Sequence, residues 1–204
     1  MANFNIIING IGLYDPQRAA PVTNLLMLRP EARTINEGIR GEEVTYFEFT
    51  HNPGSEIVFL PWQAGHITSM NIGTAQANNI DILSGKFSGC IFGYIRETDG
   101  GYSAWHVNID SAKDCTADWG IIKRGRESRE CNPWQPFRNA KLNLSHSAYC
   151  LGVIRNFTDC YSLLISRAPA TYGKIIGIYH FQGENARCAF TDDALDSSCC
   201  CVVQ

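Results

Sequence analysis

A cysteine and a histidine lie close together in the sequence and could act as a nucleophile and its base. The stretch FSGCIFGYIRETDGGYSAWHVN, residues 87–108, contains both Cys90 and His106. Between them lie an apolar run, the turn-like residues 97–101 and a second run rich in aromatic residues. An Asp-Gly-Gly sequence between two such runs is typical of an antiparallel β-hairpin. A thiol becomes a useful nucleophile when a neighbouring imidazole takes or shares its proton.

The register of this hairpin decides how close the two side chains come. If the turn centres on Thr98, Cys90 directly faces His106. If the Asp-Gly pair forms a two-residue turn, His106 faces Gly93 instead, although a bulge or a longer loop would restore the first register. The sequence leaves both registers open, and in either one the two side chains are near neighbours on adjacent strands. A non-catalytic reading also stays open, because a cysteine opening a strand is commonly part of the core.

The residues before the cysteine have types that would suit covalent catalysis. Ser88 and Gly89 allow the backbone to bend, so that amides near the thiol could point outward as donors to an oxyanion. Leu83-Ser84-Gly85 is expected to form another turn, and Ser84 lies six residues before Cys90. The other histidines lack a neighbouring turn of this kind and are interpreted as structural: His51, His66, His146 and His180. Among them, His66 follows a Pro-Trp-Gln-Ala-Gly sequence and is kept as a second-choice pocket residue.

Composition excludes several classes of function. The chain has 204 residues, of which 45% are hydrophobic and 18% charged, and its net charge of −3 gives no overall attraction to nucleic acid. No apolar run approaches the roughly 18 residues of a membrane span, and no basic region precedes the apolar residues at the N-terminus, so we expect no signal peptide. The nine cysteines are scattered without a Cys-x-x-Cys pair. We therefore expect neither a disulfide framework nor a metal site, and no cofactor.

The pattern of apolar residues predicts a single β-rich domain over residues 1–190. Runs rich in β-branched and aromatic residues, bounded by Gly, Pro, Asn or Asp, predict strands. We expect short helical turns at 22–28 and 31–39, a short helix at 110–120 and an extended loop at 121–140. The expected fold class is α+β, a β-rich sandwich of mixed or antiparallel sheets flanked by short helices. The predicted strands are 43–49, 56–60, 67–72, 80–83, 90–96, 102–109, 148–155, 161–166 and 174–181.

The local motif resembles that of the cysteine–histidine glutamine deamidases. This superfamily includes the catalytic domain of cytotoxic necrotizing factors, the Burkholderia lethal factor and the chemoreceptor deamidase CheD. Its Leu-Ser-Gly-Cys motif reads Phe87-Ser88-Gly89-Cys90 here, so the first position departs from the pattern. Two members carry a catalytic threonine six residues before the cysteine, where this chain has Ser84. The resemblance covers only the segment around residues 84–106.

The resemblance implies a reaction and a set of roles. His106 would draw the proton from Cys90, and the thiolate would attack the side-chain carboxamide of a glutamine on a protein. Amides around Ser88 and Gly89 would stabilise the oxyanion, and Ser84 or a backbone carbonyl would orient the imidazole. Water would then hydrolyse the thioester to leave glutamate, or a primary amine would give transglutaminase side activity. Candidate protein substrates are a small GTPase or a translation-initiation helicase.

The C-terminal tail, residues 191–204, suggests attachment to a membrane. Cys201-Val-Val-Gln fits the Cys-aliphatic-aliphatic-X prenylation box, and Cys199 and Cys200 could take palmitate as a second anchor. Only eukaryotic cytosol contains the transferases. The motif and the tail together predict a bacterial toxin or effector that is secreted into the host-cell cytosol and prenylated there.

Two other functions remain open from the sequence. One is a different cysteine hydrolase, a protease or an acyltransferase, which would use Cys90 with another histidine. The other is a non-catalytic β-sandwich binding module tethered to a membrane by its tail, in which Cys90 would be buried and dispensable.

Overall fold

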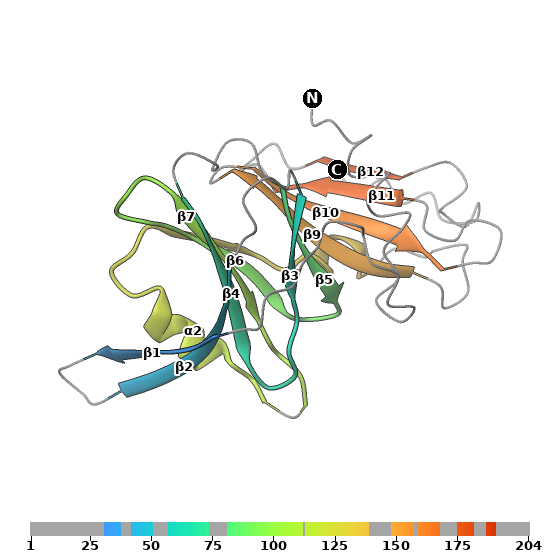
Figure 1. Cartoon of the computed structure of the whole chain (residues 1–204). Coiled ribbons are helices and arrows are strands. Elements are labelled where there is room, and N and C mark those ends of the chain that lie inside the picture. Colours follow the sequence, from blue (N-terminus) through green and yellow to red (C-terminus); the bar gives the residue numbers. More distant parts are fainter. Residues whose placement is uncertain are drawn as a thin grey trace.

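Two β-sheets, each of six strands, form the body of the protein (Figure 1). The structure is a computed structural model. It describes residues 31–37, 42–50, 57–73, 81–111, 113–138, 148–156, 159–167, 175–181 and 187–190. The β-rich sandwich predicted from the sequence is therefore confirmed at the level of fold class.

The first sheet has the strand order β1-β2-β4-β7-β6-β8. All its neighbouring pairs are antiparallel except β2 and β4, which run parallel. A single α-helix in the described part of the chain, α2 (Thr116–Ile122), packs against this sheet. The strands are β1 (Glu31–Glu37), β2 (Glu42–Phe49), β4 (Ile67–Ile72), β6 (Ile91–Arg96), β7 (Tyr102–Val107) and β8 (Ser128–Cys131).

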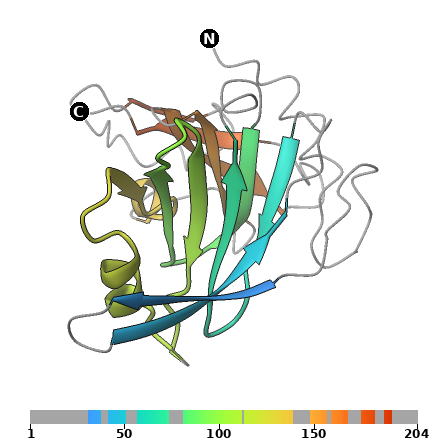
Figure 2. The same cartoon turned by 60° about the vertical axis from the view of Figure 1, so that its left-hand side comes forward.

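The second sheet has the order β12-β11-β10-β9-β5-β3, and only β5 and β3 run parallel. Turning the molecule brings the blue, cyan and green strands in front of the orange strands β9, β10 and β11 of the second sheet (Figure 2). The strands are β3 (Ile57–Pro61), β5 (Asp81–Phe87), β9 (Ala148–Asn156), β10 (Asp159–Ser166), β11 (Ile175–His180) and β12 (Arg187–Phe190).

Burial on both faces explains the near-continuous apolar strands. Every residue of β7 is buried, because one face of the first sheet packs on the second sheet and the other packs on α2. Phe92 of the first sheet packs directly on Gly152 of the second: a Cβ at Gly152 would lie 2.4 Å from the Phe92 ring. A larger residue there would push the sheets apart, so this glycine permits the close packing beside β7.

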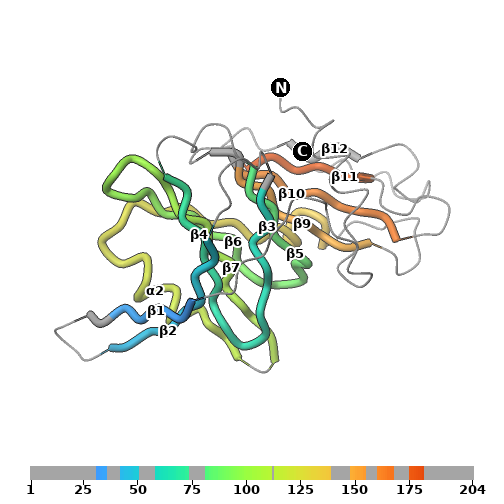
Figure 3. Tube along the Cα trace, in the orientation of Figure 1, coloured from blue at the N-terminus to red at the C-terminus, as the bar shows by residue number. Residues whose placement is uncertain are grey.

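Two short connections carry the chain from the second sheet to the first, and they cross at the same end of the molecule. Residues 62–66 join β3 to β4, and residues 88–90 join β5 to β6. Because β3 and β5 are parallel, both leave the second sheet on the same side, and β4 and β6 both begin opposite Val107 of β7. The crossings can be followed along the Cα trace (Figure 3). They flank the C-terminal end of β7.

Several local predictions were wrong. Residues 31–37 form strand β1, so antiparallel pairing with the next strand, β2, overrides the helical turn expected at 31–39. The expected loop at 121–140 contains strand β8 and a short 3₁₀ helix, Gln135–Phe137. The helix expected at 110–120 begins only at Thr116. The expected turns at 22–28 and the tail at 191–204 lie outside the described residues. Within the described ranges, no helix is both long enough and apolar enough to cross a membrane.

Candidate active site

The hairpin that carries the two candidate residues has a register that the sequence did not predict. His106 pairs with Phe92, and Gly93 pairs with Trp105, so both predicted registers were wrong. The turn explains the difference: the Glu97 amide bonds to the Gly101 carbonyl, and Gly100 has a φ of 84°. This is a three-residue loop that ends in a left-handed residue, a hairpin type that glycine favours.

Cys90 and His106 nevertheless lie on the same side of this sheet. Cys90 comes directly before β6 and packs in the same core cluster as Phe87 and Phe92. Phe92 pairs with His106, whose ring stacks on Phe87 with centroids 4.3 Å apart and an interplanar angle of 9°. Cys90 lies two residues before Phe92, the pairing partner of His106, so the thiol and the imidazole are neighbours on the same face of the sheet. Within the described part of the chain, no hydrogen bond joins them.

Ser84 lies within strand β5, so the turn expected at residues 83–85 was wrong. Its pairing with Leu60 and Gly152 places it inside the second sheet, and it is fully buried. From there its Oγ lies 2.7 Å from Nδ1 of His106 in the first sheet. The contact between the predicted hydroxyl and the predicted base is thus present, and it crosses from one sheet to the other.

A second hydrogen bond fixes the direction of this one. The Ser84 Oγ lies 2.8 Å from the carbonyl oxygen of Leu60, which can only accept. The single hydroxyl proton of Ser84 is therefore used on Leu60, and the Oγ accepts a proton from Nδ1 of His106. The imidazole is held with its proton on Nδ1, so its Nε2 carries the free lone pair.

The environment of His106 keeps the ring neutral. The side chain is 1% exposed, and this burial lowers its pKa from 6.5 to about 3. Nε2 makes no hydrogen bond to any described residue. A buried acceptor without a partner costs about 1–3 kcal/mol. An unpartnered nitrogen that is held in one orientation can accept a proton from a donor placed opposite it, and its low pKa makes it a weak base at neutral pH.

Cys90 is a buried thiol with backbone donors around its sulfur. It is 5% exposed, and the Ile109 amide donates to Sγ at 3.4 Å. Burial raises the pKa of the Cys90 thiol and the carboxylate of Asp110 raises it further, while the amides of Ile109 and of Cys90 itself lower it. At rest the pair therefore consists of a neutral thiol and a neutral imidazole, rather than an ion pair.

The connection before Cys90 is held by a residue that the sequence analysis missed. Ser88 is exposed and Gly89 is half-buried, and the Gly89 carbonyl accepts a hydrogen bond from Asn132 Nδ2 at 3.1 Å. Asn132 also caps the turn that follows it, accepting from the amide of Trp134 at 3.1 Å. An Asn-Pro pair is a turn signal, but nothing in the sequence linked it to residue 89.

The remaining histidines that the structure describes lie elsewhere. His66, the second-choice pocket residue, packs edge-on against Phe47, with ring centroids 4.9 Å apart, and a pocket role for it stays a prediction. His180 stacks on Tyr161. His51, His146 and the tail residues Cys199, Cys200 and Cys201 lie outside the described residues. In the described ranges, no group of three or more His, Cys, Asp or Glu is placed to bind a metal ion.

Comparison with known proteins adds no relative. No protein-family model matches the chain, and no curated protein matches it.

Proposed function

We propose that this protein is a protein-glutamine deamidase in which Cys90 is the nucleophile, His106 the base and Ser84 the residue that orients the base. The observation that carries the proposal is the 2.7 Å contact between Ser84 and His106. The deamidase-like motif places these two positions by their offsets from Cys90 in the sequence alone. Two residues picked by a deamidase-like motif meet across two sheets, which a chance match would not require.

The chemistry follows from the protonation states. When a glutamine carboxamide enters, His106 Nε2 takes the thiol proton as Cys90 sulfur attacks the carboxamide carbon. The resulting imidazolium keeps its hydrogen bond from Nδ1 to Ser84 Oγ, and the negative charge on the oxyanion stabilises it. The amide of Cys90, which acts on its own sulfur, is a candidate donor to the developing oxyanion.

The second half of the reaction restores the enzyme. The carbon–nitrogen bond breaks, and the leaving nitrogen takes the proton from His106 and departs as ammonia. Water then gives a proton to His106 Nε2 and attacks the thioester, and the returning proton regenerates the Cys90 thiol. The net change is one water consumed, one ammonia released and one glutamine converted to glutamate. A primary amine in place of water would give a transglutaminase product.

The wider setting is part of the same proposal. A prenylated tail at Cys201 would place the protein on host membranes, where small GTPases are candidate substrates. A translation-initiation helicase is the other candidate. Delivery of the protein into a host cell as a bacterial effector accords with both.

The test has two parts, with a single set of variants. Wild-type protein, Cys90→Ser, His106→Ala and the control Cys115→Ser are incubated with unfolded casein and with benzyloxycarbonyl-Gln-Gly. We expect ammonia from wild type and the control only, and a γ-glutamyl hydroxamate when hydroxylamine is added to trap the thioester. In parallel, iodoacetamide should alkylate native Cys90 faster in wild type than in His106→Ala. If Cys90 reacts only after unfolding and no ammonia appears, the proposal is wrong.

One observation favours a second candidate, a non-catalytic β-sandwich binding module. Cys90 is buried, and burial raises the pKa of its thiol. This candidate predicts that Cys90→Ser leaves every measurable property except stability unchanged. A protease or acyltransferase would differ from both, since a protease cleaves the casein chain and an acyltransferase transfers an acyl group without releasing ammonia.

A further inference from the structure

An exposed tryptophan stands beside the candidate site. Within the described ranges, Trp62 is the one large apolar side chain that is exposed, with 44% of its surface accessible. It lies on the connection from β3 to β4, one of the two crossings that flank the end of β7. A fixed, exposed indole offers a large apolar contact area at a small entropic cost, which is why tryptophan is enriched where proteins bind partners.

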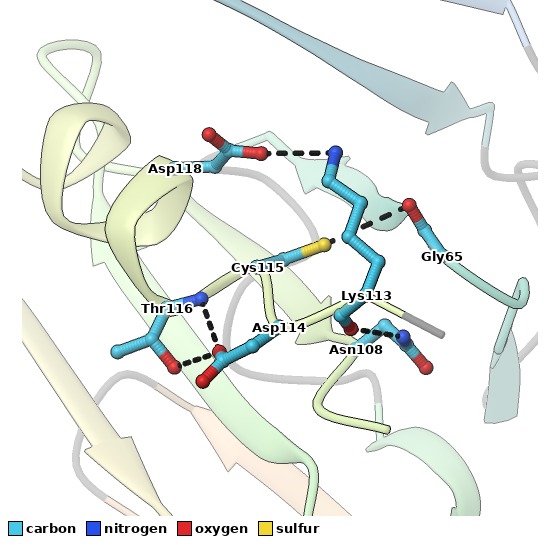
Figure 4. Close-up of polar contacts among 7 residues, drawn as sticks. All are labelled: Gly65, Asn108, Lys113, Asp114, Cys115, Thr116 and Asp118. Carbon is cyan, nitrogen blue, oxygen red and sulfur yellow. Dashed lines mark hydrogen bonds and ion pairs between the residues drawn. The ribbon is translucent and has the colours of Figure 1, made fainter. Parts of the chain in front are cut away.

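The indole of Trp62 is held in place. Its Nε1 donates to Oδ1 of Asn108 at 2.7 Å, and Asn108 is fully buried. Asn108 is fixed in turn, because its Nδ2 donates to the Lys113 carbonyl at 2.9 Å (Figure 4). The Cys115 amide also donates to the Asn108 carbonyl at 2.9 Å. The Trp62 indole is therefore held in one orientation before any partner binds.

The connection that carries Trp62 is anchored at other points as well. Cys115 Sγ contacts the Gly65 carbonyl at 3.7 Å, which ties this connection to the start of α2 (Figure 4). Thr68 Oγ1 donates to the Pro61 carbonyl at 2.6 Å. Lys113 and Asp118 form an ion pair at 3.1 Å across the same turn. Trp62 is thus an exposed side chain on a rigid segment.

Two short bridges join Trp62 to the nucleophile and to the base. Asn108 binds the indole, and the next residue, Ile109, donates its amide to Cys90 Sγ; consecutive Cα atoms are about 3.8 Å apart. On the other side, Leu60 precedes Trp62 by two residues and accepts the hydrogen bond from Ser84. Trp62 is therefore linked to Cys90 through Asn108 and Ile109, and to Ser84 through Leu60.

We infer that Trp62 is the residue by which this site recognises the protein segment that carries the target glutamine, by packing on an apolar side chain next to that glutamine. The inference rests on the proposed deamidase function. The rigid hold on the indole and its position beside Cys90 favour this occupant, since the residues flanking a glutamine must pass over the rim of the site when its carboxamide reaches the sulfur. Trp62 acts on binding, so its effect falls mainly on KM.

The experiment compares two peptides that differ only beside the glutamine, benzyloxycarbonyl-Gln-Gly and acetyl-Gln-Gly, with ammonia release as the readout. We expect wild type to prefer the aromatic peptide in kcat/KM. Trp62→Ala should lower kcat/KM about tenfold for the aromatic peptide, mainly through KM, and leave the acetyl peptide nearly unchanged; tenfold corresponds to about 1.4 kcal/mol. Trp62→Phe should retain part of the preference. Gln63→Ala, on the same connection, is the matched control and should behave as wild type.

The outcomes separate the two proposals. If wild type deamidates both peptides and Trp62→Ala changes neither, or slows both equally, the inference is wrong while the deamidase stands. If wild type releases ammonia from neither peptide nor from unfolded casein, the deamidase function and the inference fall together, whereas ammonia from casein alone would keep the deamidase and overturn the inference. Iodoacetamide labelling of Cys90 at an unchanged rate in Trp62→Ala checks that the substitution has not disturbed the nucleophile, and an unchanged rate is expected.

Discussion

Ser84 and His106 belong to different sheets, yet Ser84 Oγ and His106 Nδ1 lie 2.7 Å apart with both side chains buried. The hydroxyl donates its hydrogen bond to the Leu60 carbonyl, so it can only accept from His106, and the contact fixes which ring nitrogen of His106 is free. A single serine in the second sheet therefore sets the tautomer of a histidine in the first sheet.

Replacing Ser84 by alanine should show how much the orientation of the His106 ring contributes to activity and how much it contributes to stability. Ser84→Ala leaves Nδ1 of His106 and the Leu60 carbonyl without partners, at about 1–3 kcal/mol for each buried group. The imidazole would lose its fixed tautomer, so we expect kcat for peptide deamidation to fall by about a hundredfold, the usual size of a general-base contribution. Ammonia release and urea unfolding measure the two effects.

Ser84→Thr provides the matched control. It keeps the hydroxyl, so deamidation and the labelling rate of Cys90 should remain near those of wild type, even though the added methyl group costs stability in this packed site. If Ser84→Thr and Ser84→Ala lose activity equally, the hydroxyl has no role in orienting His106.

The buried imidazole should make the stability of the protein depend on pH. Burial lowers the pKa of His106 from 6.5 to about 3, so between these values the unfolded chain binds a proton that the folded chain does not. The stability that this group contributes is complete above pH 6.5 and is lost as the pH falls toward 3. The slope from one such group reaches about 1.4 kcal/mol per pH unit.

The measurement is the free energy of unfolding in urea at several pH values for wild type and His106→Gln. Glutamine does not titrate, so the difference between the two proteins isolates His106 from the carboxylates. We expect the wild-type curve to fall more steeply than the variant curve below pH 6.5. Parallel curves would mean that His106 titrates normally in the folded protein.

The charge of Asp110 should tune the nucleophile. The Asp110 carboxylate raises the pKa of the Cys90 thiol. Asp110→Asn removes the charge and keeps Oδ1, which accepts from the Lys113 amide at 2.9 Å. We therefore expect the apparent pKa of Cys90, read from the iodoacetamide rate against pH, to move down in Asp110→Asn. Asp118→Asn removes a charge from the same region that does not act on Cys90, and it should leave this pKa unchanged.

The sequence predicted most strands of the sandwich, because alternating or continuous apolar runs bounded by glycine, proline and asparagine report burial directly. It also named Cys90, His106 and Ser84, because the motif depends only on spacing. It could not predict the register of the hairpin, which depends on the left-handed conformation of Gly100. Leu83-Ser84-Gly85 resembles a turn locally, but these residues pair in parallel with β3, a distant partner that the local pattern does not report.

The contacts around the site could not be predicted from the sequence either, because they also depend on strand pairing. Trp62 and Asn108 are far apart in the chain, and only the two crossings at the end of β7 bring them together. Nothing local distinguishes Asn108 from any other asparagine at the end of a strand. Contacts that depend on one parallel pairing, β3 with β5, and two antiparallel pairings, β4 and β6 with β7, cannot be read from composition or periodicity.

The two sheets carry a pair of cysteines that an oxidant should join. Cys131 in β8 and Cys160 in β10 are both buried, with their sulfur atoms 3.0 Å apart. A thiol-oxidising diazene such as diamide would take two electrons and two protons from the pair and leave one disulfide between the sheets. We expect peptide mapping without reductant to recover residues 131 and 160 cross-linked, with Cys115 still a free thiol.

The disulfide should also stabilise the protein, because the bond would constrain the unfolded chain. Oxidised protein should unfold at a higher urea concentration than reduced protein, and its free energy of unfolding should be larger, typically by about 2–4 kcal/mol. Cys160→Ser should abolish both changes. Cross-linking of Cys131 to Cys150 in wild-type protein would show instead that the sulfur of Cys131 faces its other buried neighbour.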